Sequence, residues 1–306
     1  MLIKKYKRLD QSAFFLMALP GVLLLIVFNY LPMFGAIIAF KDYSPQEGIL
    51  NSPWVGFKNF EFLFNSGNAI RITFNTVFLN ICFIVSSTIG ALILALCLNE
   101  VQKKSSWLAQ LYQTLLFIPY FISYVVVAYL VFALLSSENG AVNQILRSAN
   151  VKTVNWYAEP QWWPLLLTIV NQWKWVGFGT ILYLAGLINI DTTYYEAASL
   201  EGASSLQTLW FITFPLLSPL ITINILLQIG RIFFADFGLF YNVTRDSALL
   251  YPTTDVIDTF VFRALRTLGD FGMAGAAGLY QSLAGFIVVV IANWIVRRKD
   301  PERALF

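Results

Sequence analysis

Apolar residues fill six long stretches of this chain, and shorter polar segments separate them. The stretches run over about residues 14–40, 72–98, 108–135, 163–190, 206–234 and 273–296. Each is long enough to cross about 30 Å of hydrocarbon as an α-helix. The pattern therefore predicts an all-α polytopic membrane protein, with six transmembrane helices in a single domain that covers residues 1–306.

Several of the predicted helices contain prolines inside the apolar stretch, among them Pro32, Pro119 and Pro215. Proline has no N–H to donate, and its ring collides with the carbonyl of the residue four positions earlier. Neighbouring helices can supply partners for the backbone groups that are freed in this way. We therefore expect a kink at each of these three prolines.

The composition agrees with a membrane protein and argues against several other functions. Of the 306 residues, 58% are hydrophobic and 12% are charged, whereas about 25% of the residues in a soluble domain are charged. A net charge of +3 is too small to suggest nucleic-acid binding. The chain has no histidine, and both cysteines lie in the second apolar stretch, so zinc, haem and imidazole chemistries lack ligands or bases. We expect neither a metal site nor an enzyme.

The distribution of Lys and Arg indicates the orientation in the membrane. Taken together, residues 1–12, 99–107, 191–205 and 297–306 carry positive charge more densely than the longer segments on the other side. Cytoplasmic loops of membrane proteins have an excess of Lys and Arg. We therefore expect a multi-pass protein with both termini in the cytoplasm, and a first helix that is retained because no small-residue cleavage site ends it early.

The polar segment of about residues 191–205 carries three carboxylates but neither Lys nor Arg. Its small residues Ala197, Ala198 and Ala203 would leave a helix surface with little side-chain bulk. A helix of two turns is unstable in water unless it packs against something. The segment therefore indicates either a docking element for another protein or a capped turn whose alanines only favour helix.

The same segment contains start and stop signals for a short helix. Thr193 and Glu196 have the spacing of a capping box, which predicts a helix that begins at about Tyr194. Gly202 suits the left-handed position that ends a helix. A second capping box, formed by Ser204 and Gln207, is predicted to open the fifth transmembrane helix.

Motifs in this segment and elsewhere resemble a known family of membrane proteins. Glu196-Ala197-Ala198 followed by Glu201-Gly202-Ala203, and then by Ile212, Pro215 and Pro219, resembles the EAA loop of membrane subunits of binding-protein-dependent ABC importers. Glu201 stands where that family more often has Asp, which keeps the charge. Strings such as Ile118-Pro119-Tyr120-Phe121 are similar to the oligosaccharide and polysaccharide permeases, the LplB-type and maltose-permease-like branch. The similarity extends along nearly the whole chain.

The resemblance implies a type I ABC importer fold, in which the short helix is a cytoplasmic coupling helix. The residues carried over as ATPase-coupling residues are Glu196, Ala197, Ala198, Glu201, Gly202 and Ala203. The chain has no G-x-x-x-x-G-K-[ST] phosphate loop, so ATP and Mg²⁺ are expected on the partner and no cofactor in this chain. The implied partners are a second related permease subunit, two cytoplasmic ATPase subunits and an extracellular or periplasmic solute-binding protein, assembled at a bacterial inner membrane.

Polar residues of the fifth predicted helix suggest where a solute passes. Asn224, Gln228 and Arg231 have the spacing i, i+4, i+7 and would lie on one helical face. Such residues are costly in a membrane unless they face protein or a water-filled cavity, and amide and guanidinium groups can bind sugar hydroxyls or a carboxylate. The stripe predicts either the translocation path or a structural role, in which Asn224 and Gln228 join helices and Arg231 reaches the boundary or pairs with Asp236.

A second polar cluster covers residues 171–175 of the fourth predicted helix, where tryptophan faces could stack on sugar rings or simply pack and anchor the helix. Lys174 in this cluster, together with Arg231, also leaves open a different class of function. That alternative is a secondary transporter or channel that moves a polar solute without ATP. Against it, the six stretches show no evident acidic relay for protons or sodium.

Overall fold

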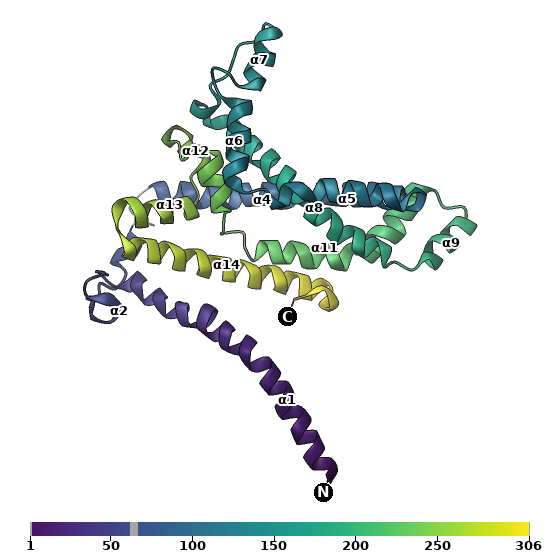
Figure 1. Ribbon diagram of the computed structural model, residues 1–306, viewed down its shortest axis with the longest axis horizontal. Helices are drawn as coiled ribbons and strands as arrows, with labels where there is room; N and C mark the ends of the chain where they lie inside the picture. The colour runs from purple at the N-terminus through teal and green to yellow at the C-terminus, as the bar shows by residue number, and fades with distance from the viewer. Residues whose placement is uncertain (1, 62–66, 306) are drawn as a thin grey trace. The chain divides into compact units, whose positions relative to one another are not determined.

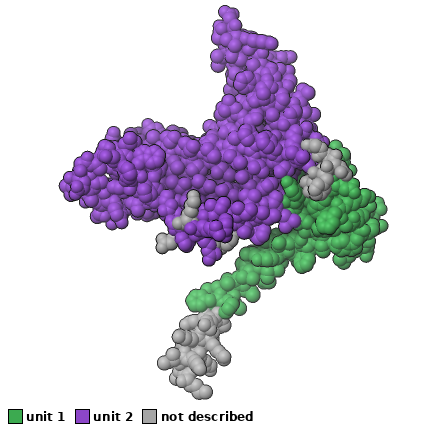
Figure 2. Space-filling model, turned by 180° about the vertical axis from the view of Figure 1, so that it is seen from behind, with its two compact units in different colours: residues 1–66, 261–280 green, residues 67–260, 281–306 purple. Residues whose placement is uncertain are grey.

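The computed structural model of this chain describes residues 2–61 and 67–305. Met1, residues 62–66 and Phe306, which the predicted single domain includes, lie outside the described residues. Two compact units can be distinguished, one of residues 1–66 with 261–280 and one of residues 67–260 with 281–306 (Figure 2). The two units are described one after the other.

The first unit contains the N-terminal helix and the loop that follows it. The helix consists of α1 (Leu2–Leu25), the π-helical turn η1 (Ile26–Tyr30) and the 3-10 segment η2 (Leu31–Phe40), and the short α2 (Gly48–Asn51) and η3 (Lys58–Phe60) follow. Lys41 is buried in the loop, where its ammonium donates to the carbonyls of Ile49 (2.7 Å) and Leu50 (2.8 Å). A buried charge thus orders this loop through backbone acceptors.

The second unit is built on long helices. These are α4 (Gly67–Lys104), α5 (Ser106–Phe121), α6 (Tyr124–Leu135), α8 (Trp163–Ile188) and α11 (Phe214–Ile229). In Figure 1, α4, α5, α8 and α11 run side by side, whereas α6 turns away from them. Part of the core between α4, α8 and α11 consists of Ala91, Ala95, Tyr183, Leu184 and Leu217.

Small residues allow α8 to lie close to α5 and α4. A Cβ added at Gly177 would stand 2.0 Å from the Leu116 carbonyl oxygen, and one added at Gly179 would stand 2.9 Å from the Ala91 side chain. Such glycines permit helix backbones in a membrane to approach each other closely. The contact at Gly177 brings the middle of α8 against the last turns of α5.

The shorter elements connect these helices. They are α7 (Ala141–Ser148), η4 (Trp156–Ala158), η5 (Pro160–Trp162), α9 (Thr192–Leu200), α10 (Ser205–Thr208), η6 (Leu209–Thr213), η7 (Leu239–Val243), η8 (Ala248–Leu250) and α12 (Tyr251–Thr254). They are followed by α13 (Ile257–Arg263), η9 (Ala264–Leu268), α14 (Phe271–Lys299) and η10 (Pro301–Arg303).

The predicted all-α membrane fold is confirmed, although the spans are less regular than the pattern suggested. Within residues 2–61 and 67–305, four helices are long and apolar enough to cross a membrane, namely Ala13–Phe40, Asn68–Lys104, Ser205–Ile229 and Phe271–Arg298. Two bent pairs complete the six if each pair counts as one span: α5 with α6, bent by 97°, and residues 160–188 with α9, bent by 67°. The fifth helix ends at Ile229, before the predicted limit at residue 234.

Each of the three prolines lies at or beside a departure from α-helical geometry, and the predicted kink is confirmed for Pro119, which precedes the 97° bend between α5 and α6. Pro32 is near the start of the 3-10 segment η2, and Pro119 lies two residues before the end of α5. Pro215 follows the π-helical turn η6. The physical cause is the one expected, because proline cannot donate the α-helical hydrogen bond at its position.

Candidate functional site

The helix predicted in the polar segment is α9, and its N-terminus differs from the prediction. The Asp191 side chain is the N-cap, since it accepts a hydrogen bond from the Thr193 N–H at 2.9 Å. The helix therefore begins at Thr192, and the predicted capping box between Thr193 and Glu196 is wrong. Asp caps a helix at least as well as Thr, so the earlier residue takes this position. The backbone N–H of Thr193 lowers the pKa of the Asp191 carboxyl.

The C-terminus of α9 is the glycine turn that the sequence predicts. Gly202 has a φ of +75°, in the left-handed region. Its N–H donates to the Ser199 carbonyl at 3.1 Å, and the Ala203 N–H donates to the Ala198 carbonyl at 2.9 Å. These two bonds form a Schellman motif, which satisfies the last carbonyls of the helix. Three residues of the EAA-like pattern thus have a direct structural role at this turn.

The second predicted capping box is confirmed. The Ser204 N–H donates to Oε1 of Gln207 at 2.8 Å, and the Gln207 N–H donates to Oγ of Ser204 at 3.4 Å. This box opens one continuous helix, in which α10, η6 and α11 follow each other from Ser205 to Ile229. The loop between α9 and the fifth span therefore needs only a few residues.

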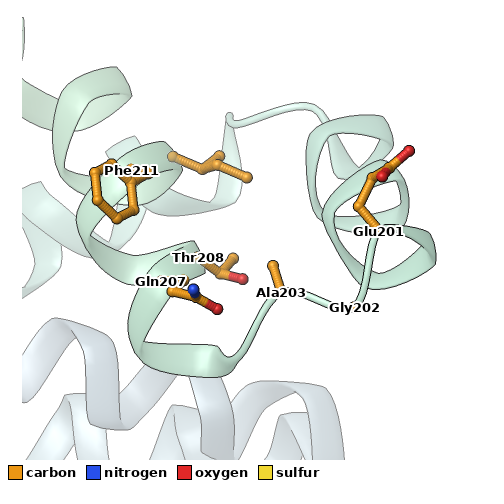
Figure 3. Close-up of a pocket in the computed structure, with 7 residues that line it drawn as sticks. Glu201, Gly202, Ala203, Gln207, Thr208 and Phe211 are labelled. Atoms are coloured by element: carbon orange, nitrogen blue, oxygen red, sulfur yellow. The ribbon is translucent and has the colours of Figure 1, made fainter.

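Most of the predicted coupling residues are accessible. Glu196, Ala197, Glu201 and Gly202 are exposed, and Ala198 and Ala203 are half-buried. A pocket of about 330 Å³ lies between the end of α9 and the start of the fifth span, with Glu201 and Phe211 on opposite sides (Figure 3). Its other lining residues are Gly202, Ala203, Gln207, Thr208 and Ile212. This region therefore consists of a self-capped helix with exposed carboxylates.

The three residues of the predicted path stripe have different surroundings. The Asn224 amide donates to the hydroxyl of Tyr183 on α8 at 2.8 Å, and Tyr183 is fully buried. Asn224 therefore joins two helices, as the structural interpretation predicts. Arg231 lies beyond the helix end at Ile229, so it does not continue the helical face. Its side chain is exposed, and the Asp236 carboxylate accepts from the Gly238 N–H instead.

The fifth span ends in a non-helical segment, residues 230–236, whose backbone groups are held by other helices. Asn80 on α4 donates to the carbonyls of Ile232 (2.9 Å) and Phe234 (3.3 Å). Gln281 on α14 donates to Phe233, and the Asp258 carboxylate accepts from the Ala235 N–H at 2.7 Å. Non-helical backbone at membrane depth is tolerated only where protein buries it or where it lines a water-filled cavity. The roles of Asn80, Gln281 and Asp258 in this segment were not predicted from the sequence.

Lys174, whose role the sequence left open, binds the free backbone carbonyls at a second break, between α5 and α6. Its ammonium donates to the carbonyls of Pro119 (3.4 Å), Tyr120 (2.9 Å) and Ile122, where α5 ends and α6 begins. It also lies 4.8 Å from the centre of the Tyr124 ring. Lys174 is 6% exposed, and an ammonium has three N–H donors. Its charge is therefore used to cap a helix C-terminus, where a cation is favourable.

Comparison with protein families and known proteins finds extensive similarity. Residues 87–301 match the family described as binding-protein-dependent transport system inner membrane component. The chain is 34% identical to protein LplB of Bacillus subtilis over 288 residues, which cover 94% of this chain and 89% of that one. It is 33% identical to the polygalacturonan/rhamnogalacturonan transport system permease protein YteP of the same organism, over 97% of this chain and 91% of that one.

Solved structures show the same fold. A chain of a bacterial ABC transporter involved in the import of the acidic polysaccharide alginate matches with a TM-score of 0.85 and 32% identity, over 97% of this chain and 98% of that one. A chain of a bacterial alginate ABC transporter in complex with an alginate pentasaccharide-bound periplasmic protein also has a TM-score of 0.85 and 32% identity, over 96% of both chains.

Proposed function

The chain belongs to the family of binding-protein-dependent transport system inner membrane components, and from this premise we propose that it forms half of the translocation path of an ATP-driven importer for an oligosaccharide or related carbohydrate. Two relatives support the substrate class, because the names of YteP and of the solved importer mention polygalacturonan, rhamnogalacturonan and alginate. All three are polysaccharides that carry acidic sugars.

The observation that carries this proposal is α9, an exposed helix between two spans that caps itself at both ends. Its Glu196 carboxylate is exposed and has no hydrogen-bond or ion-pair partner among the described residues. A short exposed helix with free carboxylates is suited to a cationic or polar cleft of another protein. We assign this cleft to a cytoplasmic ATPase, which binds ATP and Mg²⁺ and drives the spans through Glu196, Ala197, Ala198, Glu201, Gly202 and Ala203.

The proposed assembly contains this chain, a second related permease subunit, two ATPase subunits and an external solute-binding protein. The alginate importer bound to its periplasmic protein supports the last partner by analogy. Both termini and α9 lie in the cytoplasm in this proposal, as the density of Lys and Arg predicts. The family places the protein in the inner membrane as a multi-pass component.

Of the predicted path residues, we assign substrate contact to Gln228, which is half-buried on α11, and to Arg231. Arg231 is exposed and lies in the non-helical segment of residues 230–236, and its guanidinium has no hydrogen-bond or ion-pair partner among the described residues. A guanidinium binds a carboxylate in a bidentate manner, so Arg231 favours an acidic sugar. Asn224, which donates to Tyr183, contributes to the path by fixing α11 to α8.

Reconstitution of the purified complex in lipid vesicles tests the proposal. The chain is expected to co-purify with an ATPase and a second permease, and ATP is expected to drive uptake of a labelled galacturonate or alginate oligosaccharide. Glu196→Gln removes a charge-assisted contact that contributes about 1.5–3 kcal/mol, so uptake should fall by about ten-fold or more. Ser199→Ala, on the same exposed helix, is the matched control and should transport normally.

Two outcomes would contradict these assignments. Uptake by this chain alone, independent of ATP, would support the secondary transporter or channel instead. That alternative has lost one of its supports, because Lys174 caps α5 and is not free to serve an ion relay. Normal uptake by Gln228→Ala and Arg231→Ala complexes would end the path assignment but leave the importer in place.

A further inference from the structure

Tyr195 is the residue of α9 that reaches the fifth span. Its hydroxyl oxygen lies 3.3 Å from the Thr213 hydroxyl oxygen. The side chain is half-buried, whereas that of its neighbour Tyr194 is 53% exposed. Thr213 is buried at the last position of η6. Among the described residues, this pair is the side-chain hydrogen bond that joins α9 to another helix.

The direction of this hydrogen bond follows from the partners of Thr213. The Thr213 hydroxyl lies 3.4 Å from the carbonyl oxygen of Thr208, five residues earlier, and donates to it. A threonine hydroxyl has one proton and two acceptor positions, so Tyr195 donates and Thr213 accepts. Two consecutive hydrogen bonds therefore lead from α9 into the π-helical turn.

The turn that receives this contact is a weak point in the fifth span. In η6 the Phe214 N–H donates to the Leu209 carbonyl, five residues back. Pro215 cannot donate at the next position, and in a regular α-helix its ring would collide with the Phe211 carbonyl. Single π-helical turns of this kind are often found at functional sites. A displacement applied at Thr213 therefore acts where the helix already lacks one regular bond.

Among the described residues, no side-chain hydrogen bond joins the end of α9 to the fifth span in addition to the hydroxyl pair. The pocket of about 330 Å³ separates residues 201–203 from Gln207, Thr208 and Phe211 (Figure 3). The backbone connection on this side passes through Gly202, which is exposed and has no atom within 4 Å of an added Cβ. Glycine is conformationally more permissive than other residues, so this turn is a flexible connection. The contact between Tyr195 and Thr213 bypasses this turn.

We propose that the Tyr195–Thr213 hydroxyl pair transmits the displacement of α9 to α11, which makes Tyr195 a positioning residue for transport. The inference rests on the proposed function, because the displacement is assigned to an ATPase bound at α9. Beyond Thr213, α11 is one helix up to Ile229, where the non-helical segment with Arg231 begins. Movement at the π-helical turn would reach that segment through the helix.

Hydrogen–deuterium exchange of the full complex, before and after trapping with ATP and vanadate, tests this role without knowledge of the sugar. In the wild type, trapping should change the exchange of α9 and of residues 209–214 together. Tyr195→Phe should keep the change in α9 and lose the change in residues 209–214. Because a neutral hydrogen bond alters an equilibrium by a factor of about 2 to 10, exchange of residues 209–214 in the trapped state should differ from wild type by that factor.

Tyr194→Phe is the matched control, since it removes the same hydroxyl from the exposed neighbour. Thr213→Val should reproduce the Tyr195→Phe result, whereas Thr213→Ser keeps the hydroxyl and should respond like the wild type. The double variant Tyr195→Phe/Thr213→Val should lose no more of the change in residues 209–214 than either single variant. A purely structural role would alter α9 and residues 209–214 equally before trapping, and this result would overturn the inference, as would wild-type exchange in Tyr195→Phe. A wild-type complex that shows no response to ATP and vanadate would overturn the proposed function as well.

Discussion

The helices are interrupted at two places, and the side chains that bind the free backbone groups there come from different parts of the chain. The break between α5 and α6 bends the chain by 97°, and the turn between the fourth span and α9 bends it by 67°. At the first, the carbonyls that have no α-helical partner accept from Lys174, which belongs to α8. At the second, Asp191 and the turn at Gly202 cap α9 with residues of the loop itself.

The difference follows from burial, because Lys174 at the first break is 6% exposed, whereas most of α9 is exposed. Inside the hydrocarbon no water is present to bind a free carbonyl, so a break must take its donors from another helix. At the membrane surface, water and local side chains are sufficient. The first interruption is therefore locked to its neighbours, whereas the side-chain hydrogen bond that joins α9 to another helix, among the described residues, is the one between Tyr195 and Thr213.

The largest expected effect that tests this contrast is the loss of Lys174. Lys174→Met leaves the carbonyls of Pro119, Tyr120 and Ile122 without their donor. Each buried acceptor left unpaired costs about 1–3 kcal/mol. The variant should thus lose about 3 kcal/mol or more of stability, which corresponds to a fall in Tm of about 6–12 °C. Thermal unfolding in detergent measures this shift.

The matched control is Lys104→Met, which removes an exposed lysine at the end of α4. It should unfold within about 4 °C of the wild type, because exposed charges contribute about 0–1 kcal/mol. Equal melting temperatures for the two variants would show that the break between α5 and α6 is satisfied without Lys174. The contrast with α9 would then disappear.

The same contrast explains what the sequence could predict. Gly202 and the Ser204–Gln207 box were predictable because a cap at the surface lies within a few residues of the groups it satisfies. The roles of Lys174 and Asn80 were not, because their acceptors lie 52 and 152 residues away in the chain. Hydrophobic pattern alone also placed the end of the fifth span too late, since residues 230–234 are apolar enough for a helix but are held by other side chains.

Gly202→Ala tests the self-capped end of α9. A residue with a Cβ at a φ of +75° is strained by about 1–2 kcal/mol. Amides of residues 202 and 203 should therefore exchange about 5 to 30 times faster, the factor that corresponds to this free energy. Gly278→Ala is the control, because no atom lies within 4 Å of the added Cβ and φ is not positive there. Unchanged exchange in Gly202→Ala would show that the turn does not depend on glycine.

The smallest expected effect is the pH dependence of the Asp191 cap. The Thr193 N–H lowers the pKa of this carboxyl below its ordinary value of 3.8. Because the pKa of the folded protein is lower than that of the unfolded chain, the cap contributes fully at neutral pH and is lost as the pH falls below about 3.8 through the folded-state pKa. The Thr193 and Tyr194 amides, corrected for intrinsic rates, should lose protection in this range. Asp191→Asn keeps a capping oxygen without a titrating group, so its protection should not change with pH. If both proteins lose protection alike, α9 is not held by its own N-cap, and the surface helix depends on the rest of the protein as the buried break does.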